Sequence, residues 1–147
     1  MFPDDEAVQK VAGAFFDPFE YLYLRHKGGL LNTEFATQLG EVAYQVPCHL
    51  RVQNIGLKTR DVLNLVPETK VVPIERCSGH DGTYGVKKKF RQAAVKIARP
   101  VVRQVNEGNA THFTSDCPMA GAQIDGLLES PGIYQHPMSL LRQAYGI

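Results

Sequence analysis

Three stretches of the sequence decide the fold: EVAYQVP at Glu41–Pro47, KVVPIER at Lys70–Arg76 and THFTSD at Thr111–Asp116. Each is short and contains the β-branched or aromatic residues that are typical of a strand. The sequence between them has helical periodicity, and parallel neighbours in a sheet need such a crossover connection. We therefore predict an α/β fold in three layers, with a small, mostly parallel sheet of three or four strands and helices on both faces.

A cysteine follows each predicted strand: Cys48, Cys77 and Cys117. In a parallel sheet the C-terminal ends of all strands lie on one edge, and open α/β folds bind their ligands there. We therefore expect these three thiols to converge at the C-terminal ends of the strands, although they lie far apart in the sequence. Such a convergence is typical of metal and iron–sulfur sites.

Apolar residues spaced three or four positions apart predict the helices. A first helical region runs from Asp5 to about Arg25 and is broken at Pro18, which leaves a second piece at Phe19–His26. Further helices are predicted within Arg51–Val66, at Tyr84–Glu107 with a division at Pro100, at Pro118–Glu129 and at His136–Tyr145. The aromatic N-terminal segment, residues 1–40, is expected to pack over one edge of the sheet; contact with a neighbouring domain is the alternative.

The composition is that of one soluble globular domain covering residues 1–147, with 44% hydrophobic and 21% charged residues. A net charge of +1 gives no electrostatic reason to expect nucleic acid as a partner. No apolar stretch is long enough to cross a membrane, and the acidic start, MFPDDE, lacks the features of a signal peptide. Three cysteines are too few for a disulfide scaffold, so we expect a cytoplasmic protein with reduced thiols.

The loop from Cys77 to Gly85, CSGHDGTYG, is the densest chemical signal. Its three regularly spaced glycines let the backbone turn tightly and approach a bound group closely. The helix expected after it would point its N-terminus at the loop and favour a thiolate, which iron and zinc both require. The sequence lacks a P-loop, a dinucleotide fingerprint, the arginine of a cysteine phosphatase and any Cys-x-x-Cys pair.

Three motifs, in order, resemble one known domain: PCHLR at Pro47–Arg51, ERCSGHDGTYG at Glu75–Gly85 and SDCPMAG at Ser115–Gly121. This is the cysteine-rich CCG domain of heterodisulfide-reductase-like iron–sulfur proteins. The domain occurs in the B subunit of heterodisulfide reductases, in lactate and glycolate oxidase subunits, and in the C subunit of anaerobic glycerol-3-phosphate dehydrogenases. The sequence looks most like the last of these, and the resemblance covers nearly the whole chain.

The resemblance implies electron transfer through an iron–sulfur cluster, of the 4Fe–4S type, held by the CCG cysteines. By position, Cys48 matches the leading cysteine, Cys77 the first of the adjacent pair, and Cys117 the first of the terminal Cys-x-x-Cys. The sequence departs from the family at Ser78 and Ala120, where further cysteines would stand. Three thiolates therefore remain of five, and zinc is the alternative metal.

The resemblance also implies partners. Members of the family usually carry two such domains, often after a ferredoxin-like segment, and only one copy is present here. We therefore expect the C-terminal half of a longer protein, or one piece of a split one. Its partners would be flavoprotein dehydrogenase subunits or the missing N-terminal CCG and ferredoxin domains. The complex would place the chain at the inner face of the cytoplasmic membrane, as a peripheral component.

Three histidines are candidates for a fourth metal ligand: His80 first, His136 second and His49 third. A Cys₃His set completes a tetrahedral zinc site. The same set, or three thiolates with an exchangeable position, can hold a four-iron or three-iron cluster. His80 would otherwise order the glycine loop through hydrogen bonds, and His136 would otherwise cap the last helix. The residues expected around the metal without binding it are Ser78, Gly79, Asp81 and Asp116, together with His49 where another histidine is the fourth ligand.

Several functions therefore remain open at the level of the sequence. The chain is an electron-transfer component without an active site of its own, or a zinc-binding or docking module without redox activity. A third possibility is an enzyme that uses Cys77 as a nucleophile, activated by His80. Any one cysteine taken alone is better explained as a small core residue. The basic group Lys87, Lys88, Lys89 and Arg91 is either a solvated face or a docking site for an acidic redox partner.

Overall fold

A parallel sheet forms the centre of the molecule in the computed structural model, which describes residues 2–80, 82 and 85–147. Its strands are β1 (Gly40–Gln45), β2 (Thr69–Ile74) and β3 (His112–Thr114), in the order β2-β1-β3. Both pairs are parallel, with Gly40 opposite Thr69 and Val42 opposite His112. The predicted α/β fold with a small parallel sheet is confirmed.

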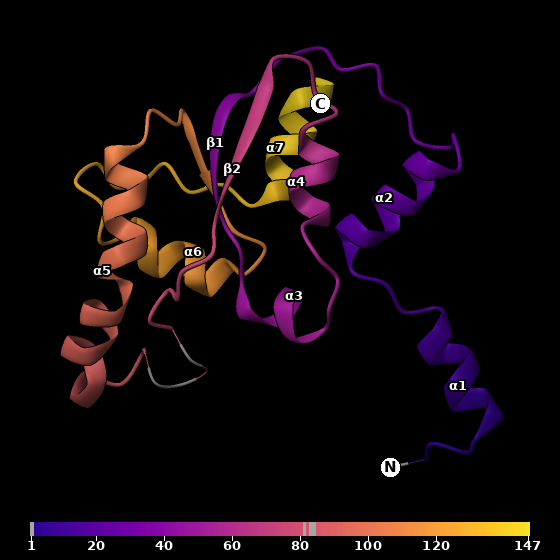
Figure 1. The fold of residues 1–147 in the computed structure, drawn as a ribbon, viewed down its shortest axis with the longest axis horizontal. Coiled ribbons are helices and arrows are strands. Elements are labelled where there is room, and N and C mark those ends of the chain that lie inside the picture. The colour runs from indigo at the N-terminus through magenta and orange to yellow at the C-terminus, as the bar shows by residue number, and fades with distance from the viewer. Residues whose placement is uncertain (1, 81, 83–84) are drawn as a thin grey trace.

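The two faces of the sheet are covered by different helices (Figure 1). Side chains alternate along β1, so that Val42 and Tyr44 enter one hydrophobic core and Ala43 enters the other. The first core is completed by α2 (Pro18–Lys27), α4 (Lys58–Leu63) and α7 (Pro137–Tyr145). The second is completed by α5 (Arg91–Glu107) and α6 (Pro118–Asp125). The predicted three layers are therefore present.

Helix α2 begins at Pro18 and ends at Lys27, one residue beyond the predicted piece Phe19–His26 at each end, and the predicted break before it is present. The carboxylate of Asp17 caps the helix by accepting hydrogen bonds from the backbone N–H groups of Phe19, at 2.9 Å, and Glu20, at 3.3 Å. Proline is favourable at this first helical position because its missing N–H would have no partner in the helix. The cap fixes the direction of α2, and Phe19, which is only 1% exposed, anchors it in the first core.

Helix α1 (Glu6–Gly13) does not pack over the sheet, although the N-terminal segment was predicted to do so. It has no buried residue, and Val8, Val11 and Phe15 are 46%, 62% and 82% exposed. Figure 1 shows α1 standing away from the rest of the molecule. The helix ends at Gly13, and the connection through Asp17 is not helical, so the apolar face of α1 is not carried onto the sheet.

Helix α5 corrects two predictions. It begins at Arg91, after a single 3₁₀ turn at Lys88–Phe90, instead of at Tyr84, which lies outside the described residues. It also continues through Pro100 without a division. Pro100 is exposed, so the carbonyl of Lys96, which loses its helical hydrogen bond at a proline, can turn toward water.

Helix α6 is shorter than predicted, ending at Asp125 instead of Glu129. The Asp125 carboxylate accepts hydrogen bonds from the backbone N–H groups of Gly132, Ile133 and Tyr134 at 2.8 to 3.0 Å. It thereby holds the following turn against the helix end. One short helix, α3 (Cys48–Val52), was not separately predicted. None of the helices in the described ranges is both long and apolar enough to cross a membrane.

Candidate metal centre at the carboxyl edge of the sheet

The three cysteines follow the carboxyl ends of the three parallel strands. Cys48 is the first residue of α3, after β1; Cys77 follows β2; and Cys117 is the N-cap residue of α6, after β3. All three are free, with Cys48 and Cys77 exposed and Cys117 half-buried. Each cysteine therefore lies three residues beyond the last residue of its strand.

The cysteine side chains do not form a finished metal site as they stand. Within residues 2–80, 82 and 85–147, no group of three or more His, Cys, Asp or Glu side chains is arranged to hold a metal ion. The fold thus supplies three free thiols after three neighbouring strands, without a finished metal site among the described residues.

The loop after Cys77 is pinned to the two helices on its side of the sheet. The carbonyl of Ser78 accepts a hydrogen bond from Nε2 of Gln123, in α6, at 2.8 Å. Gly79 adopts a φ of +72°, and a Cβ there would collide with the carbonyl oxygen of Ala94, in α5. Glycine is therefore required at this position, both for its backbone conformation and for the close approach. The N–H of Gly79 points back to the Sγ of Cys77, 3.4 Å away.

His80 has an unusual environment for a histidine. Its Nε2 is buried and has no hydrogen-bond partner among the residues that the structure describes. A buried nitrogen without a partner costs about 1–3 kcal/mol, so this atom is suited to meet a ligand. Asp81, predicted to lie beside the metal, is outside the described residues. The backbone N–H of His80 donates to the Oγ of the buried Ser78, at 3.2 Å.

His136 caps helix α7, which is the alternative role that the sequence left open for it. Its Nδ1 accepts a hydrogen bond from the backbone N–H of Met138 at 3.2 Å. The other ring nitrogen makes no hydrogen bond among the described residues. His49 is exposed on α3, directly after Cys48, and its ring makes no hydrogen bond within the described part of the chain.

Asp116, predicted to lie near the helix cap or beside the metal, is held by two hydroxyl groups. Its carboxylate accepts hydrogen bonds from Tyr44, in β1, at 2.6 Å and from Thr59, in α4, at 2.7 Å. Burial raises the pKa of Asp116 above its usual value, against the two hydrogen bonds, which lower it. Burial and the neighbouring Asp116 raise the pKa of Tyr44. The network ties β1, α4 and the segment after β3 together directly beside Cys117.

A second network, which sequence reasoning missed, lies under all three cysteine-bearing segments. Gln45, only 1% exposed, donates from Nε2 to the carbonyl of Arg76 at 3.1 Å and accepts from Oγ of Ser115 at 2.8 Å. One amide at the end of β1 therefore binds the chain after β2 and after β3. The signal in the sequence is a glutamine that follows the apolar run Val42–Tyr44 at the end of a strand.

Tyr134 completes the floor of this edge. Its hydroxyl donates to the carbonyl of Ser115 at 3.2 Å, and its ring occupies the space that a Cβ at Gly121 would fill. Burial, together with the neighbouring Cys117 and Asp116, raises the pKa of Tyr134 to about 12. The phenol therefore stays neutral at physiological pH and serves as a hydrogen-bond donor.

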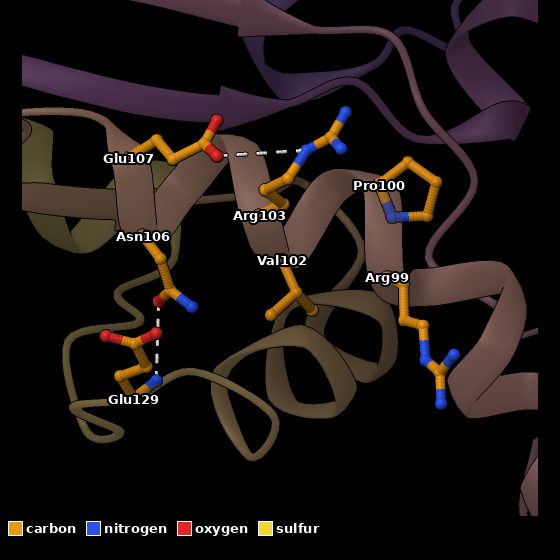
Figure 2. A pocket seen from close by; sticks show the side chains of 7 residues that line it. All are labelled: Arg99, Pro100, Val102, Arg103, Asn106, Glu107 and Glu129. Atoms are coloured by element: carbon orange, nitrogen blue, oxygen red, sulfur yellow. Dashed lines mark hydrogen bonds and ion pairs between the residues drawn. The ribbon is translucent and has the colours of Figure 1, made fainter.

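Two hollows on the surface differ in their relation to the cysteines. One of about 480 Å³ lies along the C-terminal half of α5, where Arg103 pairs with Glu107 at 3.9 Å (Figure 2). Asn106 in the same hollow accepts a hydrogen bond from the backbone N–H of Glu129 at 3.3 Å. This hollow along α5 contains none of the predicted site residues. The other, of about 450 Å³, includes His80 and the residues after Cys117.

Comparison with known proteins yields one kind of relative. The chain is 31% identical over 105 residues to the C subunit of the anaerobic glycerol-3-phosphate dehydrogenase of Escherichia coli strain K12, and equally to that of Escherichia coli O157:H7. The match covers 71% of this chain and 26% of each relative, so the chain spans about a quarter of their length. No family model matches the chain, and no solved structure does.

Proposed function

We propose that this chain is an electron-transfer component of a flavin-linked dehydrogenase complex, with an iron–sulfur cluster bound at the carboxyl edge of its sheet. The observation that carries the proposal is the placement of Cys48, Cys77 and Cys117 after three neighbouring parallel strands. The similarity to the C subunit of an anaerobic glycerol-3-phosphate dehydrogenase supports it, because that relative is by name one part of a multi-subunit oxidoreductase.

The chemistry of the donors fits a thiophilic metal. Three free thiols and the unpartnered Nε2 of His80 supply four ligands of the kinds that bind iron–sulfur clusters and zinc. Binding would require the loops to bring the ligands into one arrangement, and Cys48 and Cys77 are exposed and so free to reorient. We assign Cys48, Cys77 and Cys117 as ligands, His80 as the fourth ligand and His136 as the runner-up.

The surrounding residues have separate tasks in this proposal. A bound cluster would accept one electron and pass it on. The Gln45 and Asp116 networks would keep the three cysteine segments in register. The pinned Ser78–Gly79 backbone would keep one face of the site closed. The electron donor would be a flavoprotein subunit, or a protein that corresponds to the part of the relatives' sequence that this chain does not cover. The assembly would be peripheral to the cytoplasmic membrane.

A structural zinc site is the second candidate, because only three cysteines are present. Ser78 and Ala120, which stand at the two positions that depart from the CCG pattern, are both buried, at 5% and 4% exposure. Neither residue can supply a thiolate. A Cys₃His set satisfies zinc completely, and the metal would then join the three loops without redox activity.

Purification without oxygen, followed by iron, labile sulfide and zinc analysis, separates the two candidates. We expect iron and sulfide in stoichiometric amounts; zinc with no labile sulfide would replace the electron-transfer proposal with the structural one. Replacing Cys48, Cys77 or Cys117 by serine should abolish binding equally in each case, because each thiol is one ligand of a shared site. The control His26→Ala, in α2, should bind as the parent does.

The single variants also test the geometry of the proposed site. If Cys117→Ser kept its metal while Cys77→Ser lost it, a local site around Cys77 and His80 would be the better account. His80→Ala and His136→Ala then identify the fourth ligand, since we expect the first to lose or weaken binding and the second to leave it unchanged. Iodoacetamide labelling of the metal-free chain tests the nucleophile alternative, which requires Cys77 to react faster than free cysteine.

A further inference from the structure

A groove beside two of the cysteine segments combines exposed apolar side chains with uncompensated positive charge. It is the hollow of about 450 Å³ whose walls are the residues after Gly85 on one side and the start of α6 on the other. Val86 is 63% exposed and Met119 is 52% exposed, one on each wall. We call it the Val86–Met119 groove.

The groove adjoins both cysteine-bearing loops. His80, three residues after Cys77, and Pro118, directly after Cys117, line it. Gly85 connects the groove to the loop, since a Cβ there would lie 3.2 Å from the Cα of His80 and 2.9 Å from Oε1 of Gln123. A molecule seated in the groove would therefore contact the backbone that carries two of the three thiols.

The rim of the groove is strongly basic. Lys87, Lys88, Lys89 and Arg91 are all exposed. Arg91 lines the groove itself, Lys87 and Lys88 line a smaller hollow of about 260 Å³ that shares Arg91 with it, and Lys89 follows them in sequence. No ion pair involves any of these four residues within the described part of the chain. The positive charge continues along α5, because seven of the 16 lysine and arginine residues lie between 87 and 103, with no Asp or Glu among them.

We propose that the Val86–Met119 groove is the docking site for an acidic protein segment that presents an apolar side chain. Charge complementarity selects the partner: carboxylates would neutralise the lysine rim and speed association, while burial of Val86 and Met119 would slow dissociation. The apolar side chains line a hollow, which suits an inserted side chain better than a bilayer surface. The docking proposal deepens the proposed function. It rests on that function only where it identifies the partner as a redox protein.

The docking itself needs no metal, so it is tested on the 147-residue chain both metal-free and as purified without oxygen. The probe is a fluorescein-labelled peptide of about ten glutamates with two central leucines, followed by anisotropy at low and at moderate salt, roughly 50 and 300 mM. The same peptide with serines for the leucines measures the apolar contribution. We expect binding in both metal states, weakened by salt, and several-fold tighter for the leucine peptide.

Charge-reversal variants locate the site. Lys88→Glu with Arg91→Glu should weaken binding of the leucine peptide by roughly tenfold, through lost attraction and new repulsion. The matched control, Lys10→Glu with Lys27→Glu, makes the same change in net charge on α1 and α2 and should bind as the parent does. Met119→Ser should remove the preference for leucine over serine without changing the salt dependence. Circular dichroism confirms that each variant is folded.

Several results would overturn the docking proposal without touching the proposed function. One is that the leucine peptide does not bind the parent chain at all. Another is that the Lys88/Arg91 variant and the Lys10/Lys27 control bind the leucine peptide equally. A third is that the leucine and serine peptides bind equally well. Binding of phosphatidylcholine vesicles with about 30% phosphatidylglycerol, lost in the Lys88/Arg91 variant while the peptide does not bind, would assign the surface to a membrane instead. Absence of iron and sulfide, with peptide binding intact, would remove the electron-transfer proposal and keep the docking site.

Discussion

Helices α1 and α7 share an amphipathic sequence pattern but have opposite surroundings. Both are short, have one apolar face, and begin at a residue whose side chain accepts hydrogen bonds from the first turn, Asp5 in α1 and His136 in α7. In α7 the apolar residues Leu140, Leu141 and Ala144 are buried in the first core. In α1 none is buried. An amphipathic pattern therefore predicts a helix but not the surface that the helix covers.

The largest expected difference between the two helices is in core packing. Leu140→Ala should lower the free energy of unfolding by about 2–5 kcal/mol, because Leu140 is fully buried and its removal leaves a cavity. Val11→Ala should change it by less than about 0.5 kcal/mol, because Val11 is 62% exposed. Urea denaturation at neutral pH measures both. A Val11→Ala cost equal to that of Leu140→Ala would mean that α1 packs on the body in solution.

A smaller effect on stability is expected from the tyrosines near the carboxyl edge of the sheet, and none from the exposed N-terminal segment. Tyr44→Phe should cost about 1–3 kcal/mol at neutral pH, since the Asp116 carboxylate loses one of its two hydroxyl partners. Stability should also fall as the pH rises above about 10, the usual tyrosine pKa. The pKa values of Tyr44 and Tyr134 are raised in the folded protein, Tyr134 to about 12, so the unfolded chain releases these protons first.

Urea denaturation between about pH 9 and pH 12 checks this alkaline loss. Tyr44→Phe should show a smaller loss than the parent, because one buried phenol that must stay neutral has been removed. Deletion of residues 2–14 is the control and should leave the pH dependence unchanged, since α1 buries nothing. An equal alkaline slope in Tyr44→Phe and the parent would contradict the assignment to Tyr44.

The smallest effect concerns the two aspartate caps. Asp17→Ala should lower the free energy of unfolding by about 1 kcal/mol, because it caps α2, which is anchored in the core by Phe19. Asp5→Ala should leave global stability unchanged and only increase amide exchange in α1, because that helix can unwind without disturbing the core. Equal losses of global stability in Asp17→Ala and Asp5→Ala would show that α1 contributes to the folded body as α2 does.

The sequence was sufficient to predict the strands, the break at Pro18 and the helix start at Pro118, because short β-branched runs and prolines are local signals. It was insufficient for the side-chain networks beneath the cysteines. Tyr44 meets Asp116 across 72 positions, and Gln45 meets Ser115 across 70. Such contacts depend on the order of strands in the sheet, which local patterns do not contain. The continuity of α5 at Pro100 depends likewise on which side of the helix faces water.

The order of the strands also has a consequence for biosynthesis. The central strand β1 gains its neighbour β2 within the first half of the chain, whereas β3 is made only after the long helix α5. A chain emerging from the ribosome can therefore pair β1 with β2 and bring the segments of Cys48 and Cys77 together early. Cys117 and the Ser115 contact to Gln45 follow many residues later. Any maturation factor that delivers a metal to this edge would meet two thiols before the third has been translated.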